Sequence, residues 1–440
     1  MEKFFQLKKA GTNVRTEIIA GLTTFMTMVY VLVVQPAAII GFGSGESFVD
    51  INGVTLTREG LILTTALVTA VITLLMGLYT NLPLALSTGM GSNFLLGTMI
   101  QNHELSFGGA MSIILVSGVI FLALSILGIR EVIVKMIPRN IKIAISATIG
   151  FFIAYLGFDN TGIADFSAGI SLGDVRSPAV LLSIAGLLII AALTALKVPG
   201  AILIGIIAIT LAGIPFGITT LPSQPISIPN FASMEGLVFN FDFASLISGS
   251  AMVLIFVAFF SDFFSTLGTV LGVAGKAGML DENGDLPGIE KPFMVDAIGT
   301  FVGSFTGNTT VTTFVESTTG VEAGGRTGLT AVTTAILFLL ALFFAPIFLI
   351  IPSAATGPAL IFVGILMISG LENIDFTSFE DAFGPIIMIL FCIFTASIAS
   401  GISAGILAHV AIKLLVGKWR DIHIGMYILC VPLIIYFAFV

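Results

Sequence analysis

The chain is divided into apolar runs about as long as a membrane-spanning helix, and this feature restricts its fold more than any motif. A helix needs roughly 20 apolar residues to cross the hydrocarbon core of a bilayer. About fourteen runs meet this requirement, and an apolar tail at 424–440 is either a further span or an interfacial helix. The runs lie near residues 18–40, 61–80, 84–100, 109–128, 141–158, 179–196, 199–216, 245–272, 293–306, 308–325, 328–348, 354–371, 383–399 and 401–417.

The amino-acid composition indicates the same class of protein. Of the 440 residues, 57% are hydrophobic and only 10% are charged, whereas about 25% of the residues in soluble domains are charged. This balance excludes a soluble enzyme, a nucleic-acid binder and a disordered scaffold. Cys392 and Cys430 lie in apolar runs without metal-ligating neighbours, so neither a metal nor a cofactor is expected. The sequence therefore predicts an all-α polytopic membrane protein.

The positions of the basic residues predict the direction of the spans. Lys and Arg accumulate in the cytoplasmic loops of membrane proteins. If the N-terminus is cytoplasmic, only Arg58 and Arg176 of the 17 basic residues fall in outside segments. The first span has no small-residue cleavage site after it and is expected to be retained. We therefore predict a multi-pass protein of the cell membrane with a cytoplasmic N-terminus.

The two halves of the chain share a weak internal repeat. Pro138 and Pro352 each precede an apolar helix that carries a glycine, Gly150 or Gly364, at the same offset from the proline. Since each half contains seven predicted spans, the second half must be inverted in the membrane. Inverted repeats with a binding site between them are typical of transporters. The alternative is a chance resemblance between apolar helices.

Two of the predicted spans are rich in Asn, Ser, Thr and Gly, at residues 81–93 and 307–320. Lipid cannot satisfy the free backbone groups that such residues favour. We expect each segment to be a short extended stretch followed by a half-helix, buried in protein and lining a cavity. The two half-helix N-termini would then present backbone N–H groups to a ligand. The alternative is the close packing of small residues between ordinary helices.

Two carboxylates lie inside apolar runs. Asp262 is in the middle of its run, and Glu316 is at the expected break in another. A buried acid costs several kcal/mol unless it is paired, hydrogen-bonded or protonated, and is a functional candidate by default. Neither run contains a basic residue. The sequence therefore favours a hydrogen bond to a ligand or the binding of a proton, with capping of a broken helix as the structural alternative.

Other polar residues near the spans receive structural interpretations. Asp296 lies near the start of the predicted span at 293–306. At this position, we expect capping of the helix at least as much as a role in transport. Glu322 and Arg326 are expected to anchor a loop, and His409 to be a core histidine. The catalytic motifs HExxH, GxSxG and GxxxxGK[ST] do not occur in the sequence, so an enzyme is not expected.

Six motifs along the chain are shared with one transporter family. They are Thr-Thr-Phe-Met-Thr-Met-Val-Tyr at 23–30, Gly-Met-Gly-Ser-Asn at 89–93, Ser-Asp-Phe-Phe-Ser-Thr-Leu-Gly-Thr at 261–269, Thr-Thr-Phe-Val-Glu-Ser at 312–317, Gly-Gly-Arg-Thr-Gly-Leu-Thr-Ala-Val at 324–332 and Gly-Pro-Ala-Leu-Ile-Phe-Val-Gly at 357–364. With them, essentially the whole chain resembles the azaguanine-resistance-type purine permeases, a branch of the second nucleobase:cation symporter family.

The resemblance implies two inverted repeats of seven spans that form a core domain and a gate domain. The core domain would comprise residues 1–130 and 240–348, and the gate domain residues 131–217 and 349–440. It also implies uptake of nucleobases coupled to protons. The protein would lie in membrane lipid, with a homodimer as an open alternative to a monomer.

The resemblance also implies which residues bind the substrate. The binding residues of the family fall on Asn93, Asp262 and Glu316 by motif position, and Ser265 replaces a second acid that is common in the family. A flat purine fits a pocket that stacks its faces on Phe and reads its edge with carboxylate, amide and backbone N–H groups. Asp262 or Glu316 would carry the coupling proton. The candidate binding residues are Thr88, Gly89, Asn93, Phe260, Asp262, Ser265, Phe314, Val315 and Glu316.

These observations predict a secondary transporter that imports adenine, guanine or hypoxanthine by proton symport, with alternating access around a site between the two domains. One alternative is a sulfate or bicarbonate transporter of the same fold, although Asp262 and Glu316 would repel an anion. A uracil- or xanthine-type nucleobase transporter is a second alternative. A channel or membrane structural protein and an intramembrane enzyme are further alternatives of other classes.

Overall fold

The computed structural model describes residues 2–41, 45–128, 137–166, 171–222, 224–247, 249–281 and 286–439. Arg130 and Lys135, two of the basic residues counted on the cytoplasmic side, lie outside these residues. The boundary expected between residues 130 and 131 lies outside them as well.

Most of the described chain is α-helical. Nine of its helices are long and apolar enough to cross a membrane, so the prediction of a helical integral membrane protein is confirmed. The long helices are α2 (Val14–Met28) with α3 (Val31–Ile40), α4 (Arg58–Thr80), α6 (Phe107–Leu127), α8 (Arg139–Thr161), α9 (Pro178–Ala195), α11 (Gly249–Lys276), α14 (Gly328–Ala341) with α15 (Ala345–Leu349), α16 (Ser353–Ile368) and α18 (Ile398–Leu415).

Shorter elements connect or flank these helices. They are the helices α1 (Glu2–Phe5), α5 (Met90–Gln101), α10 (Ala201–Ala212), α12 (Glu290–Phe305), α13 (Ser317–Glu322), α17 (Phe379–Thr395) and α19 (Ile424–Phe439), and the 3-10 turns η1 (Phe231–Met234), η2 (Phe243–Ile247), η3 (Leu342–Phe344), η4 (Ser369–Asn373) and η5 (Trp419–Asp421). The strands are β1 (Ser47–Val49), β2 (Thr55–Thr57), β3 (Leu86–Thr88), β4 (Ala164–Asp165), β5 (Ser171–Leu172) and β6 (Val311–Thr313). The apolar tail forms α19, which packs against α18 and α11.

Local sequence signals define where the long helices begin and end. The side chains of Thr57 and Ser106 accept hydrogen bonds from backbone N–H groups in the first turns of α4 and α6, which satisfies donors that a helix start leaves free. Asn81 and Gly128 end these two helices in the left-handed conformation, with φ of 57° and 68°. These are residue types that tolerate positive φ.

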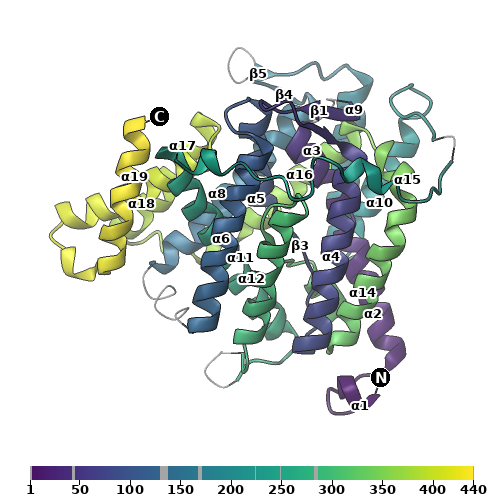
Figure 1. The fold of residues 1–440 in the computed structure, drawn as a ribbon, viewed down its shortest axis with the longest axis horizontal. Helices are drawn as coiled ribbons and strands as arrows, with labels where there is room; N and C mark the ends of the chain where they lie inside the picture. Colours follow the sequence, from purple (N-terminus) through teal and green to yellow (C-terminus); the bar gives the residue numbers. More distant parts are fainter. Residues whose placement is uncertain are drawn as a thin grey trace.

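The positions of the N-terminus and of three strands distinguish the two ends of the molecule. The N-terminus and α1 lie at one end, whereas β1, β4 and β5 lie at the other (Figure 1). Since α8 runs from Arg139 to Thr161, just before β4, its first turn lies at the end that carries the N-terminus. We call this the N-terminal end. Arg58 follows β2 and therefore lies at the opposite end.

The centre of the molecule contains a strand pair formed by segments far apart in sequence. Strands β3 and β6 pair antiparallel, with Leu86 opposite Thr313 and Thr88 opposite Val311. One residue separates β3 from α5, and three residues separate β6 from α13. The expectation that both segments are extended and then helical is confirmed. The structure adds that the two extended stretches pair with each other.

The two helices that carry the repeated glycines pack against each other. A Cβ atom added to Gly150 would lie 2.8 Å from the carbonyl oxygen of Gly364, and one added to Gly364 would lie 2.5 Å from that of Gly150. Only glycine permits this approach of α8 to α16. The two glycines that share an offset from a proline in the sequence thus meet directly here.

Candidate functional site

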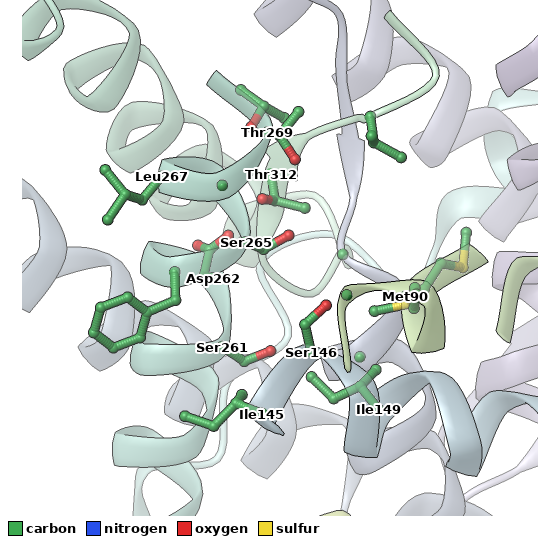
Figure 2. A pocket seen from close by; sticks show the side chains of 18 of the residues that line it. Met90, Ile145, Ser146, Ile149, Ser261, Asp262, Ser265, Leu267, Thr269 and Thr312 are labelled. Carbon is green, nitrogen blue, oxygen red and sulfur yellow. The ribbon is translucent and has the colours of Figure 1, made fainter. Parts of the chain in front are cut away.

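A large cavity adjoins the β3–β6 pair and has a volume of about 780 Å³. Its wall comes from the first turn of α5, the end of β6 with the start of α13, the middle of α11, the first half of α8, and α16 with η4. Figure 2 shows Asp262 and Ser265 of α11, Thr312 of β6, Met90 of α5 and Ser146 of α8 around this space. Segments from both halves of the chain therefore enclose one pocket.

The turn from β3 into α5 brings backbone to the cavity wall. The N–H of Gly89 donates to the carbonyl oxygen of Thr310, at 2.6 Å. A Cβ atom at this position would lie 2.5 Å from Thr310 Oγ1, so a larger residue would push the two segments apart. Gly89 and the next three residues all line the cavity.

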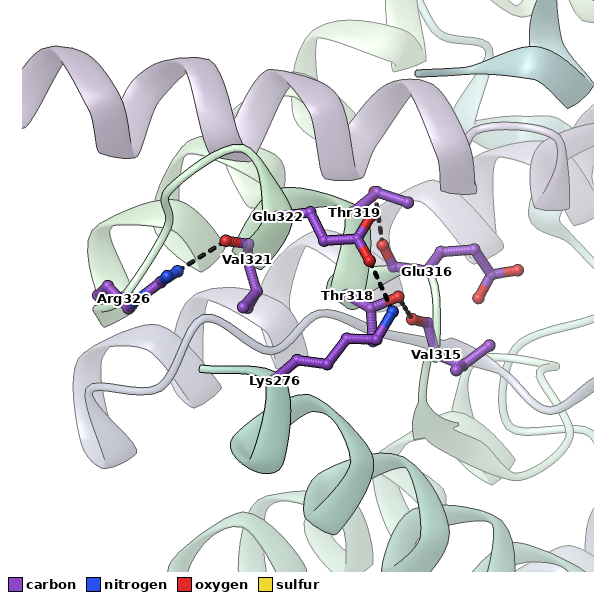
Figure 3. Close-up of polar contacts among 8 residues, drawn as sticks. All are labelled: Lys276, Val315, Glu316, Thr318, Thr319, Val321, Glu322 and Arg326. Carbon is purple, nitrogen blue, oxygen red and sulfur yellow. Dashed lines mark hydrogen bonds and ion pairs between the residues drawn. The ribbon is translucent and has the colours of Figure 1, made fainter. Parts of the chain in front are cut away.

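Glu316 lies at the other break, between β6 and α13, and lines the same cavity. The Tyr30 hydroxyl donates to its Oε1 atom at 2.7 Å. Its backbone carbonyl accepts hydrogen bonds from the N–H and hydroxyl groups of Thr319 (Figure 3). The Glu316 carboxylate is therefore held by a neutral hydroxyl donor and keeps lone pairs for a ligand.

The neighbouring Glu322 has a different role. Its carboxylate forms an ion pair with Lys276 at 2.6 Å, and both side chains are exposed. Arg326 donates to the carbonyl oxygens of Val321 and Gly325. The interpretation of Glu322 and Arg326 as loop anchors is confirmed (Figure 3).

Asp262 is almost fully buried in the middle of α11 and lines the cavity. Its Oδ2 atom accepts a hydrogen bond from the Thr300 hydroxyl at 2.6 Å. Its Oδ1 atom has no hydrogen-bond partner among the described residues. A buried oxygen without a partner is costly, so a ligand donor or a proton at Oδ1 would stabilise this state.

Asp296 corrects the sequence interpretation. Helix α12 begins at Glu290, which places Asp296 in its second turn rather than at its cap. Its side chain is fully buried, and neither carboxylate oxygen has a partner among the described residues. Asp296 and Thr300 lie four residues apart and therefore share one face of α12. Because Thr300 bonds to Asp262, Asp262 lies beside the face of α12 that carries Asp296.

A third buried acid, Glu17 of α2, stabilises the segment that follows α13. Its carboxylate accepts hydrogen bonds from the backbone N–H groups of Arg326, Thr327 and Thr330 and from the Thr330 hydroxyl. The Glu17 side chain is fully buried. Its charge is thus satisfied by four donors at the start of α14, which indicates a structural role.

The structure brings six of the nine predicted binding residues to the cavity wall. They are Gly89, Asp262, Ser265, Phe314, Val315 and Glu316. The other three do not line it. Thr88 and Asn93 are fully buried behind the wall: the Asn93 amide donates to Thr88 Oγ1 and accepts from the Thr309 hydroxyl. Phe260 packs against the rings of Phe256, Phe259 and Phe264.

Sequence reasoning missed several residues of the wall. Phe264 lines the cavity one helical turn after Phe260. Tyr30 lies in a motif shared with the family, but no residue near it in sequence indicated a contact with Glu316. The sequence analysis also did not include five lining residues that carry hydroxyl groups, namely Ser92, Ser146, Ser261, Thr310 and Thr312.

The cavity combines aromatic surfaces with a polar edge. Phe264 and Phe314 supply apolar faces, while Asp262 and Glu316 supply acceptors. This arrangement suits a flat ligand with several N–H donors on its rim. An anion beside the two acids would be repelled. Among the described residues, no group of three or more His, Cys, Asp or Glu side chains could hold a metal ion.

Comparison with known sequences identifies the family. Residues 15–404 match the model of the Permease family, Xan_ur_permease. The chain belongs to this permease family. The permease is 37% identical to the guanine/hypoxanthine permease PbuG of Bacillus subtilis, with all of both chains covered. It is 35% identical to the adenine permease AdeQ of Escherichia coli, over 96% of this chain and 93% of that one. The resemblance found in the motifs is confirmed, as is the expectation of a transporter rather than an enzyme.

Solved structures resemble the permease in fold. The transmembrane domain of the cyanobacterial bicarbonate transporter BicA matches with a TM-score of 0.62 and 15% identity, over 90% of this chain and 97% of that one. SLC26A9 matches with a TM-score of 0.61 and 11% identity, over 91% of this chain and 65% of that one. At such low identity, the likeness concerns the arrangement of the chain alone.

Proposed function

We propose that the permease imports purine nucleobases, namely adenine, guanine or hypoxanthine, and couples their entry to protons. The observation that carries the proposal is the cavity in which Asp262, Glu316 and two phenylalanines meet. It supports a flat, donor-rich ligand. Relatives named for purine bases, at 35–37% identity over nearly the full chain, support purines in particular.

The architecture that we propose has fourteen spans in two inverted repeats of seven. The core domain comprises residues 1–130 and 240–348, the gate domain residues 131–217 and 349–440, and the N-terminus is cytoplasmic in the cell membrane. The direct meeting of β3 with β6 and of α8 with α16 supports this arrangement, because inverted repeats place equivalent segments around one axis. The cavity then lies between the domains and is open toward the cytoplasm, since it reaches the first turn of α8.

The alternative substrates are less well supported. A sulfate or bicarbonate carrier shares the fold, but Asp262 and Glu316 would repel an anion in the part of the cavity that they line. A uracil- or xanthine-type transporter would also use an acid at the base edge, and only its substrate preference would differ. A direct test uses purified protein: guanine, hypoxanthine or adenine should bind in competition with one another, whereas sulfate in excess should displace none. Displacement by sulfate would favour the anion carrier.

Proton coupling gives a testable expectation for accumulation. Oxygens of Asp262 and Asp296 have no hydrogen-bond partner within the described part of the chain. They support a proton site, because a buried carboxylate without partners is stabilised by protonation. A protonophore that collapses the proton gradient should lower steady-state base accumulation roughly to equilibrium, and replacing sodium by choline should have little effect. Accumulation that survives the protonophore but requires sodium would show that sodium is the coupling ion.

Asn93 gives an expectation for substrate preference. Its amide lies behind Gly89 and Ser92 and bonds to Thr88 and Thr309, so it would act by positioning this wall rather than by touching the base. Asn93→Ala should weaken binding of all purines by roughly tenfold, the cost of leaving buried partners unsatisfied. Asn93→Asp should also change the order of preference, because it replaces the amide donor to Thr88 Oγ1 with an acceptor and so shifts the wall that contacts the base.

Competition curves for adenine, guanine and hypoxanthine measure this effect. Thr98→Ala, on the same helix, serves as the control. The Thr98 hydroxyl donates to the Phe94 carbonyl within this helix, so its loss should not move the wall of the cavity. If both Asn93 variants weaken every base equally, without a change in order, Asn93 is only a structural residue of α5.

A further inference from the structure

The cavity contains a feature that base transport does not use, a pair of cations at its N-terminal end. Arg139 and Lys142 both line it. They lie three residues apart in the first turn of α8 and therefore on one face of the helix. The two acids lie deeper, on α11 and between β6 and α13. The cavity thus has an acidic inner part and a basic mouth.

The mouth also carries neutral polar side chains. Ser369 and Asn373 of η4 line the cavity, and η4 packs against α8. The ammonium group of Lys142 lies 5.4 Å from the centre of the Phe264 ring, which itself lines the cavity. Lys142 is half-buried while Arg139 is exposed. The Ser369 hydroxyl donates to the Leu366 carbonyl, so the two cations and the Asn373 amide form the donor set for a phosphate.

The size of the cavity exceeds what one base requires. A volume of about 780 Å³ is in the range of pockets for drug-sized ligands, whereas a purine base is a small planar fragment. A ligand that fills the whole space must be neutral and rich in donors at one end and anionic at the other. A purine nucleoside 5′-monophosphate has this division of charge.

We propose that a purine nucleoside 5′-monophosphate binds this cavity from the cytoplasmic side, with its base at Asp262 and Glu316 and its phosphate at Arg139 and Lys142. The proposal rests on the proposed function, because it places the base in the transport site. The bound nucleotide competes with the base and holds the inward-open form. Reactions that convert imported bases to nucleotides would then slow further import through their own product.

The experiment measures binding to the purified full-length protein by calorimetry. Guanosine 5′-monophosphate should bind, compete with guanine, and bind at least roughly tenfold more tightly than guanosine, because of its charge-assisted hydrogen bonds. Arg139→Gln and Lys142→Gln should each raise the ratio of the nucleotide Kd to the guanine Kd about tenfold. Lys142→Arg keeps the charge and should restore most of the affinity. Lys291→Gln, at an exposed cation of α12 outside the cavity, should leave the ratio unchanged.

The outcomes separate this proposal from the proposed function. Guanine binding without nucleotide binding, or equal affinities for nucleotide and guanosine, would overturn the nucleotide site and leave base transport intact. Displacement of the nucleotide by equimolar inorganic phosphate would show a simple phosphate site and would also overturn it. If none of guanine, hypoxanthine and adenine binds while nucleotide binding still depends on Arg139 and Lys142, the transport proposal is wrong and the phosphate site stands.

Discussion

Glu316→Gln is expected to reduce purine uptake by roughly 10- to 100-fold while the protein remains in the membrane at wild-type levels. The substitution keeps the shape of the side chain but removes the charge that would hold the donor edge of the base. Loss of one or two charge-assisted hydrogen bonds accounts for an effect of this size. The measurement is initial uptake of radiolabelled guanine, hypoxanthine and adenine, normalised to the amount of membrane-inserted protein.

A matched control lies on the same short helix. Glu322→Gln is an equally conservative substitution that also removes a negative charge. That charge pairs with Lys276 at the surface, where an ion pair contributes little to stability. Its uptake should stay near that of the wild type. Tyr30→Phe removes the hydrogen bond to Glu316 and should cause an intermediate loss. Wild-type uptake by a correctly inserted Glu316→Gln protein would show that this charge is dispensable.

The second large effect is expected at the buried pair formed by Asp262 and Asp296. Asp262→Asn removes a cavity acid and should abolish both base binding and accumulation. Asp296 does not line the cavity, so Asp296→Asn should leave base binding within a few-fold while accumulation against a gradient falls by roughly tenfold or more. The distinction arises because Asp296 would act on the proton and on Asp262, not on the base.

Equilibrium binding and proton-driven accumulation, measured on the same membrane preparations, separate these two roles. Asp375→Asn, at an exposed loop residue, serves as the control and should change neither quantity. Equal losses of binding and accumulation in Asp296→Asn would mean that Asp296 shapes the site. Unchanged accumulation would exclude it from coupling.

The sequence was sufficient to predict the class of the fold and the two acids of the cavity. Asp262 and Glu316 stand out because lipid-like surroundings make a lone carboxylate costly. The extended stretches at β3 and β6 were predictable from their Ser, Thr and Gly content, since these residues break helices in apolar surroundings. Their mutual pairing was not, because the strands lie more than 200 residues apart and no local signal specifies a partner.

Errors of one helical turn account for most of the remaining differences. Phe260 and Phe264 lie one turn apart on α11 with their rings in contact, and Phe264 is the one of the two that lines the cavity. The span predicted at 293–306 begins three residues late, which made Asp296 resemble a cap instead of a buried acid. Similarly, the first span predicted at 18–40 left Glu17 just outside, although it is fully buried.

The most direct test of the central claim is an uptake panel in cells that lack their own base transporters. The cells express the permease or an empty vector and receive radiolabelled adenine, guanine, hypoxanthine, xanthine, uracil or sulfate. We expect permease-dependent accumulation of at least one of adenine, guanine and hypoxanthine, lost in the Glu316→Gln variant, and no accumulation of sulfate. Accumulation of sulfate without any purine base would contradict the assignment of this cavity to purines.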